Sequence, residues 1–563
     1  MCGILAIFNS LQSVPWPKAF DAGVKRGPDR SNMKMINNQI LFGFHRLAIH
    51  GLNDDNANQP MTINGITLIC NGEIYNYKTL FEQHDMRPKT ESDCEIIIRL
   101  YEKKGIAYVL EHLDGVYAFT LHDAMENVVY VARDRFGVRP LYQLNVTDTI
   151  AFASELKALM PLMMPLMPLT DVNDDAPPQV KHVLPSTYLE LRPNKQGNWI
   201  IYKSVQLTHE SLMPPNIYGP YNGVPDYIHI CLKLSEAVKK RVEGLQGHTS
   251  LACLLSGGLD SSLIAALVKK YAPTDLTIET YSIGMAGSQD LVYAQIVADH
   301  LGTKHTSLVL TEDDFFNAIP EVITAIESYD TTTVRASVGN YLIGKYIKAN
   351  SQAKIVFNGD GSDELTGGYL YFHAAPDPEA FDSECRRLLG DIYLFDVLRS
   401  DKCISSHGLE PRTPFLDREW VKYYLSIPAS GGLRMPAKKH IEKELLRVAF
   451  AQVMPDLLPN KVLWRTKEAF SDGVSGLQKA WYEIVQEQVK NKNLVQDNYD
   501  EEFVYPLSTR PTTPEQAYYR RIYEEAYPGM AYLVPYFWLP RFIKGVTDAS
   551  ARTLDLYKSR QNI

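Results

Sequence analysis

The segment Leu251–Ser262 has the sequence LACLLSGGLDSS and decides the fold class of the larger part of the chain. Its first five residues form an apolar run typical of a buried strand, and the apolar run Leu263–Val268 behind it predicts a helix. Between them, two glycines let the backbone approach a ligand closely, and serine hydroxyls and helix N-terminal N–H groups can bind phosphate. The Gly-Lys-Ser/Thr ending of a Walker A loop is missing. The segment therefore predicts a phosphate-binding turn of another type; the alternative is an ordinary glycine-rich turn between a strand and a helix.

Strands and helices alternate around this loop. The segments Thr277–Ile283 and Lys354–Phe357 predict two further strands, while Ile228–Val242 and Leu291–Leu301 predict helices. This alternation predicts a parallel sheet with helices on both faces, an α/β fold. Because ligands of such sheets bind beyond the carboxyl ends of the strands, residues that follow each strand are expected to meet at one site.

Acidic residues follow two of these strands. Asp260 lies in the loop and Asp363 lies just after the third strand, so both are expected to face the same phosphates. Bare carboxylates beside phosphates need a hard cation, so the sequence predicts Mg²⁺ at Asp260 and Asp363. For Asp363 alone, the alternative is a charge that stabilises a helix N-terminus.

The first part of the chain has a different character. Short β-type runs such as Ile66–Cys70 and Val128–Val131 end at turn residues, and Asp93–Lys103 places its apolar residues on one helical face. These patterns predict a strand-rich domain at the N-terminus.

The domain boundaries follow from these changes in pattern. Residues 1–192 are expected to form the first domain, and residues 227–545 the second. Residues 193–226, rich in Pro, Gly, Asn and Tyr, predict a linker, and residues 546–563 predict a polar, frayed tail.

Composition narrows the class of protein. A net charge of -9 over 563 residues argues against a general nucleic-acid binder. Seven cysteines without a CxxC pair suggest neither a zinc site nor a disulfide framework. No signal peptide is visible, and the longest apolar stretch, Leu159–Leu169, is too short and too interrupted by proline to cross a bilayer. We therefore expect a cytosolic protein that binds neither nucleic acid nor membrane.

Cys2 follows the initiator methionine directly. If Met1 is removed, one residue carries both a nucleophilic thiol and a free α-amine, whose ordinary pKa of about 7.7–8.0 allows it to act as a base near neutrality. The alternative is a small apolar residue at the start of a strand.

The segments that follow Cys2 resemble the glutaminase domain of class II (N-terminal nucleophile) glutamine amidotransferases, a family with a four-layer αββα sandwich. The segments that carry the resemblance are Arg26–Asp29, His45–Ile49, Asn71–Asn76 and Ser92–Asp93. By the resemblance, Cys2 is the nucleophile, and Asn71 and Gly72 donate to the developing oxyanion. Arg46 and Asp93 then hold the α-carboxylate and α-amine of glutamine, and Glu73 is expected to face the amine as well. Alternatively, Asn71 and Gly72 form a hairpin turn and the charged residues lie on the surface.

The loop after the first parallel strand resembles the pyrophosphate loop of ATP pyrophosphatases, which adenylate their substrates. The resemblance implies that ATP is bound by this loop and by residues that end the next strands. The expected ATP-binding residues are Leu255, Ser256, Gly257, Gly258, Asp260, Ser261, Ile283, Asn358 and Gly359.

A glutaminase domain followed by such a loop resembles the glutamine-hydrolysing asparagine synthetases, over essentially the whole chain to about Arg541. The resemblance implies that glutamine, aspartate and ATP are the substrates and that ammonia passes between the domains. It is also compatible with a protein that forms a homodimer. It places Thr333, Arg335 and Lys443 in the pocket for aspartate and pyrophosphate, with Arg335 catalytic. The alternatives are a structural ion pair for Arg335 and a solvated charge for Lys443.

Two features depart from the family pattern. Asp360 stands where the family usually has glutamate, so the reach of a carboxylate expected to be catalytic is reduced, and the stretch 162–178 is longer than expected. Two rivals stay open: amidation or cyclisation of a different acid on the same scaffold, and a degenerate paralogue that binds nucleotide without turnover.

Overall fold

The computed structural model describes the chain except residues 10, 13, 164–178, 208–224, 246, 432, 437–439, 477, 497–502, 504–505, 556 and 558–563. The expected excess length at 162–178 therefore lies almost entirely outside the described residues. In the part of the chain that is described, no helix is long and apolar enough to cross a membrane.

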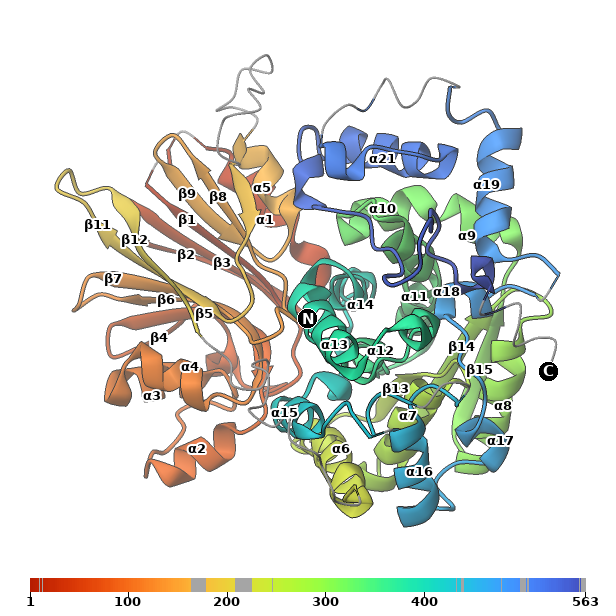
Figure 1. Ribbon diagram of the computed structural model, residues 1–563. Helices are drawn as coiled ribbons and strands as arrows, with labels where there is room; N and C mark the ends of the chain where they lie inside the picture. The colour runs from red at the N-terminus through yellow and green to blue at the C-terminus, as the bar shows by residue number, and fades with distance from the viewer. Residues whose placement is uncertain are drawn as a thin grey trace.

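The N-terminal part contains two six-stranded antiparallel sheets that pack face to face (Figure 1). The first has the order β10-β8-β9-β1-β3-β2 and the second β12-β11-β7-β6-β5-β4. The strands of the first sheet are β1 (Gly3–Phe8), β2 (Arg30–Asn37), β3 (Ile40–Arg46), β8 (Tyr142–Val146), β9 (Thr149–Ala153) and β10 (Val180–His182). Those of the second are β4 (Met61–Ile63), β5 (Ile66–Ile74), β6 (Gly115–Asp123), β7 (Val128–Arg133), β11 (Thr187–Pro193) and β12 (Trp199–Gln206).

Helices cover the outer faces of both sheets, which completes the expected αββα sandwich. They are α1 (Trp16–Asp21) and α5 (Leu156–Met163) on the first sheet, and α2 (Tyr77–Gln83), α3 (Glu95–Lys104) and α4 (Ile106–His112) on the second (Figure 1). The alternation along β1 shows why both faces are buried. Ile4, Ala6 and Phe8 pack between the sheets, whereas Leu5 and Ile7 pack against the helices.

The second part is built on a five-stranded parallel sheet of order β15-β14-β13-β16-β17. Its strands are β13 (Ser250–Leu254), β14 (Thr277–Gly284), β15 (Lys304–Val309), β16 (Ile355–Phe357) and β17 (Glu410–Arg412). The expected α/β fold is confirmed.

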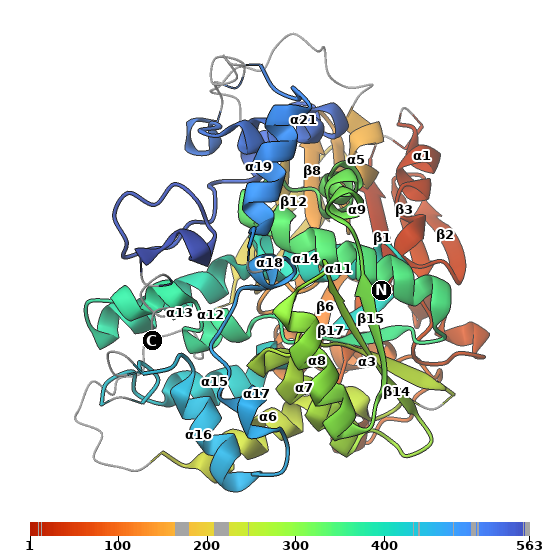
Figure 2. The same ribbon diagram turned by 90° about the vertical axis from the view of Figure 1, so that its right-hand side faces the viewer.

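Helices lie on both faces of this sheet. One face carries α6 (Tyr227–Val242), α7 (Leu259–Tyr271) and α8 (Gln289–Leu301) (Figure 2). The other carries α10 (Ile319–Ile326), labelled in Figure 1, together with α11 (Thr331–Asn350) and α14 (Asp396–Ser405). Along β13, Leu251 and Cys253 face the first group and Ala252 faces the second. Every strand and helix predicted above from a named segment is present, but some extend beyond the predicted ends. The strand expected to end at Cys70 continues through Asn71 and Gly72 to Ile74, so these two residues do not form a hairpin turn.

Two expected boundaries are wrong. The predicted linker 193–226 includes β12, which pairs with β11 in the N-terminal sheet over Thr187–Pro193, so the first domain extends to about Gln206. The predicted frayed tail begins too early, because Asp548 pairs with Arg335, and Ser550 donates to Asp472. Composition favoured a loop in both places, whereas tertiary contacts order these residues.

Buried charges join the two parts. Asp401 on α14 forms ion pairs with Arg26 at 2.7 Å and with Arg139 at 3.3 Å. Arg412 on β17 lies 3.3 Å from Glu73 on β5. Burying such pairs contributes little net stability, but their geometry fixes how the two parts pack. This packing holds the start of β1 and the carboxyl edge of the parallel sheet in fixed positions relative to each other (Figure 1).

Candidate active sites

Cys2 lies immediately before β1, at the edge of the core between the two sheets. Arg26 donates to its carbonyl oxygen over 2.9 Å, and its Sγ lies 3.7 Å from the carbonyl oxygen of Leu47. Burial raises the pKa of the thiol to about 11 and lowers that of the Met1 amine to about 5. With Met1 in place the thiol is therefore protonated at neutral pH, and the base expected beside it exists only once Met1 is removed.

Strand β5 carries Asn71 and Gly72. Asn71 follows Ile69 by two residues, so the two side chains point to the same face of the strand. Ile69 packs between the two sheets, and Cys2 packs against the same core. Its amide is fully buried, and among the described residues neither its nitrogen nor its oxygen has a hydrogen-bond partner. An unsatisfied buried amide costs about 1–3 kcal/mol, so this one is available to a ligand.

Gly72 is required by its surroundings. A Cβ at this position would lie 2.6 Å from the carbonyl oxygen of Val116 and 2.8 Å from the Cα of Tyr117 on β6. No larger residue fits without displacing the sheet, so the close approach of two strands sets the position of the Gly72 N–H group.

Four of the five expected glutamine-binding residues line one pocket with Cys2: Arg46, Gly72, Glu73 and Asp93. Asn71 is absent from the described lining of this pocket. Arg46 is held by the carbonyl oxygens of His50 and Gly51, at 3.0 and 2.6 Å. Asp93 accepts from the backbone N–H of Ile74 over 2.7 Å, and burial raises its pKa.

The same pocket contains two residues that the sequence did not single out, His50 and Glu410. His50 pairs with Glu73, and Glu410 comes from β17 in the other part of the chain. No sequence signal places Glu410 here, because the packing of the two parts brings it in. His50 follows the segment His45–Ile49 directly, but its role depends on the distant Glu73.

The second cavity, of about 200 Å³, opens at the carboxyl edge of the parallel sheet. Its lining includes most of the residues expected to bind ATP and aspartate: Leu255, Ser256, Gly258, Asp260, Ser261, Ile283, Thr333, Asn358, Gly359, Asp360, Asp363 and Lys443. These residues come from five separate segments, which only the tertiary fold brings together.

The loop after β13 is shaped by its own polar groups. Ser261 on the first turn of α7 accepts from the backbone N–H of Ser256 over 3.2 Å, and the two hydroxyls lie 3.0 Å apart. Gly257 adopts φ 69°, and a Cβ there would lie 2.4 Å from the Cβ of Tyr293. Gly257 therefore allows the loop to pack closely against Tyr293. It is absent from the described lining of the cavity.

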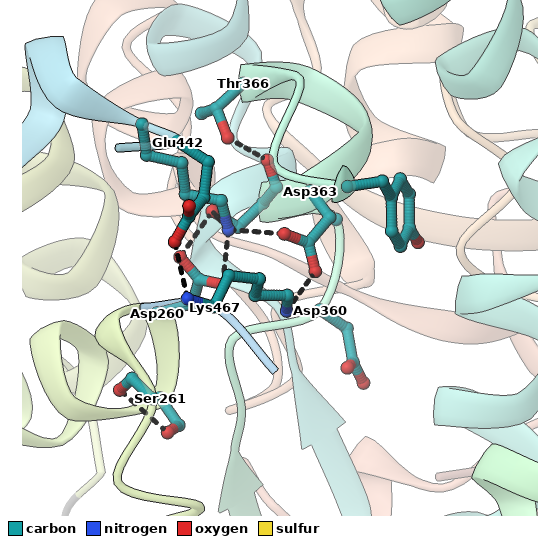
Figure 3. A network of polar contacts seen from close by, with 12 residues as sticks. Asp260, Ser261, Asp360, Asp363, Thr366, Glu442 and Lys467 are labelled. Atoms are coloured by element: carbon teal, nitrogen blue, oxygen red, sulfur yellow. Dashed lines mark hydrogen bonds and ion pairs between the residues drawn. The ribbon is translucent and has the colours of Figure 1, made fainter. Parts of the chain in front are cut away.

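Asp260 and Asp363 converge on one cation. Lys443 Nζ lies 2.5 Å from an oxygen of each carboxylate, and Lys467 Nζ lies 2.6 Å from the other oxygen of Asp363 (Figure 3). Burial alone would raise the pKa of Asp363, but the two lysines hold it well below its usual range. The sequence analysis assigned no role to Lys467.

Arg335 on α11 differs from the expectation. Its guanidinium contacts Glu515 at 2.6 Å and Asp548 at 2.8 Å, and the described lining of the cavity includes Thr333 but not Arg335. The structural ion pair that the sequence left as an alternative is thus present. Both partners lie about 200 residues away in the chain, so the sequence could not reveal them.

Asp360 lies at the end of β16, facing the cavity (Figure 3). Arg399 donates to one of its oxygens over 3.2 Å, whereas the other is buried and has no hydrogen-bond partner among the described residues. Glu364 nearby is buried beside Asp396 and Asp363, and burial together with these charges raises its pKa. The cavity therefore contains one oxygen of Asp360 without a hydrogen-bond partner among the described residues, beside carboxylates that are already paired.

The chain thus joins a pocket around Cys2 to a second cavity at the carboxyl edge of a parallel sheet, the arrangement of an amidotransferase coupled to a nucleotide-dependent ligase. A glutamine amidotransferase domain matches residues 1–203, and an asparagine synthase domain matches residues 230–380 and 374–527. Glutamine-hydrolysing asparagine synthetases from Homo sapiens and Gallus gallus are each 40% identical to it, over 99% of this chain and 99% of theirs. The chain belongs to the family of glutamine-hydrolysing asparagine synthetases.

Among solved structures, glutamine phosphoribosylpyrophosphate amidotransferase from B. subtilis is similar at a TM-score of 0.31 and 15% identity, covering 55% of this chain and 91% of that one.

Proposed function

We propose that this chain makes asparagine from aspartate, with glutamine as nitrogen donor and ATP as activator. One observation carries the proposal: a single chain holds the pocket with Cys2 and a second cavity with the loop Ser256–Ser261. The full-length similarity to asparagine synthetases supports aspartate as the acceptor.

In the first half-reaction, Cys2 Sγ attacks the side-chain amide carbon of glutamine. Its thiol proton passes to the Cys2 α-amine and then to the leaving nitrogen, which departs as ammonia. Asn71 and Gly72 donate to the oxyanion, and Arg46, Glu73 and Asp93 hold the α-carboxylate and α-ammonium groups. Water then cleaves the thioester and yields glutamate.

In the second half-reaction, the β-carboxylate of aspartate attacks the α-phosphorus of ATP and expels pyrophosphate. The loop around Ser256 and the cation Lys443 hold the phosphates, and Thr333, which lines the cavity, is proposed to orient aspartate. Ammonia then displaces AMP from β-aspartyl-AMP, and Asp360, with its unpaired oxygen, accepts the proton that the attacking nitrogen loses.

Mg²⁺ fits beside Asp260 and Asp363, because oxygens of both carboxylates already converge on one cation, the Lys443 ammonium. When bound there it would neutralise charge on the departing pyrophosphate.

The experiment that tests the function measures pyrophosphate release with ATP, Mg²⁺ and one carboxylic acid at a time. We expect release with aspartate and much less with glutamate or other acids. Release that is independent of aspartate would favour a different acceptor on this scaffold. Saturable ATP binding without any release would favour the paralogue that binds but does not turn over.

Replacing Asn71 by alanine is expected to lower kcat for glutamine hydrolysis about 10²- to 10³-fold, because one oxyanion donor is lost. Ammonium-dependent asparagine formation should stay unchanged, because Asn71 is remote from the second cavity. Glutamate release and asparagine formation measured on one preparation check both statements; an unchanged glutamate rate would remove Asn71 from the oxyanion site.

Replacing Asp360 by asparagine should lower asparagine formation about 10²-fold, because the amide cannot take the proton from the attacking nitrogen. Formation of β-aspartyl-AMP should continue, and this is measurable as aspartate-dependent exchange of labelled pyrophosphate into ATP. Asp360→Glu keeps the charge and is the matched control, expected to retain amidation. Equal loss of exchange and amidation in Asp360→Asn would contradict a role specific to the nitrogen step.

A further inference from the structure

His50 lies in the Cys2 pocket and has no part in the mechanism above. Its side chain is 12% exposed, and Nε2 lies 2.9 Å from a carboxylate oxygen of Glu73. Its carbonyl oxygen accepts from Arg46, so the same residue that fixes the guanidinium also places an imidazole in the pocket.

Charged groups from several elements face this imidazole. Glu73 comes from β5, Asp93 from the turn before α3, Arg412 from β17, and the ring of Tyr77 on α2 lies 5.8 Å away. Burial alone would lower the pKa of His50, but Glu73 and Asp93 outweigh burial and the opposing effect of Arg412, and raise it to about 9. Glu410 lines the same pocket.

The geometry leaves little room for a further cation beside His50 and Arg412, whose guanidinium lies 3.3 Å from the same carboxylate of Glu73. The ligating atoms of His50, Glu73 and Asp93 all lie within 4.8 Å of one another. Glu73 and Asp93 are the carboxylates proposed to receive the α-ammonium of glutamine, so that ammonium would arrive within a few ångströms of a charged imidazole. Two like charges so close together in a buried pocket repel each other strongly.

We propose that His50 is the resident cation of the subsite for the α-ammonium group of glutamine, and that glutamine binding expels its proton. The inference rests on the proposed function, because it assumes that this pocket binds glutamine. His50 acts here as a specificity and positioning residue: it neutralises Glu73 when the pocket is empty and yields that carboxylate to the ligand.

The sign of the pH dependence follows by linkage. Binding lowers the proton affinity of the imidazole, so the complex holds fewer protons than the free protein between the two pKa values. Affinity for the ammonium form of glutamine therefore rises with pH up to about pH 9, by at most about tenfold per unit.

The test is titration calorimetry at pH 7.5 on full-length Cys2→Ala protein, which cannot turn glutamine over. Buffers of different ionisation enthalpy give the number of protons released on binding. We expect about 0.5 to 1 proton per glutamine. Glutaramate, which is glutamine without its α-amine, should bind with no release; this arm needs no change at His50.

The second arm compares Cys2→Ala/His50→Gln with Cys2→Ala/His300→Gln, the latter replacing an exposed histidine on α8. The His50 variant should bind glutamine at least as tightly without releasing protons, and the His300 variant should behave as the parent. Equal release by glutamine and glutaramate, or unchanged release in the His50 variant, would overturn the proposal. Absence of glutamine binding to the Cys2→Ala parent would instead defeat the proposed function of the pocket.

Discussion

Cys2→Ala protein is expected to lose glutamine-dependent asparagine formation by ~10³-fold or more, since loss of a nucleophile removes the covalent route altogether. Its ammonium-dependent asparagine formation is expected to stay within about twofold of the parent, because the second cavity is formed by other residues. Both rates are measured as asparagine produced from aspartate and MgATP, with glutamine or ammonium as the only nitrogen donor.

The matched control is Cys231→Ala on α6, which removes a buried thiol that is absent from the described lining of both cavities. This control should keep both activities. If Cys2→Ala protein still used glutamine, or if it lost the ammonium reaction as well, the assignment of two separate sites would fail.

Asp260→Asn protein is expected to lose asparagine formation from both nitrogen donors, by at least about 10²-fold. Asp260 is one of the two carboxylates that converge on Lys443 beside the phosphate loop, so its loss removes half of the proposed Mg²⁺ site and one partner of that lysine. Hydrolysis of glutamine to glutamate should persist. The measurement is pyrophosphate and glutamate release in parallel over a range of Mg²⁺ concentrations.

Asp275→Asn, in the exposed turn after α7, is the control for a lost charge of the same kind and should keep both activities. Normal pyrophosphate release by the Asp260 variant would exclude Asp260 from the ATP site. Loss of glutamate release together with pyrophosphate release would indicate a folding defect instead.

The sequence was sufficient for features that are local. The strand, turn and helix of Leu251–Ser262 predicted the parallel sheet, and the position of acidic residues after its strands predicted that Asp260 and Asp363 meet. The segments around Cys2 predicted that Arg46, Gly72, Glu73 and Asp93 share its pocket, whereas Asn71 is absent from the described lining. In each case a short motif on a regular element determines where the side chain lies.

Features that depend on long-range contacts were missed. Arg335 carries the expected charge, but its pairing with Glu515 and Asp548 depends on chain segments that had no recognisable pattern. Strand β12 lies in a region whose Pro, Gly and Asn content favours a loop, and it is ordered by pairing with β11. Glu410 enters the Cys2 pocket only because the two parts of the chain pack together.

The most direct test of the central claim uses glutamine labelled with ¹⁵N in its amide, with aspartate, MgATP and an excess of unlabelled ammonium. The proposed function predicts that the label appears in asparagine above the fraction set by free ammonium, because nitrogen released at Cys2 reaches the second cavity inside one molecule. Asparagine that carries label only at the fraction present in the bulk ammonium would contradict transfer between the two sites. The absence of asparagine under these conditions would contradict the proposed function itself.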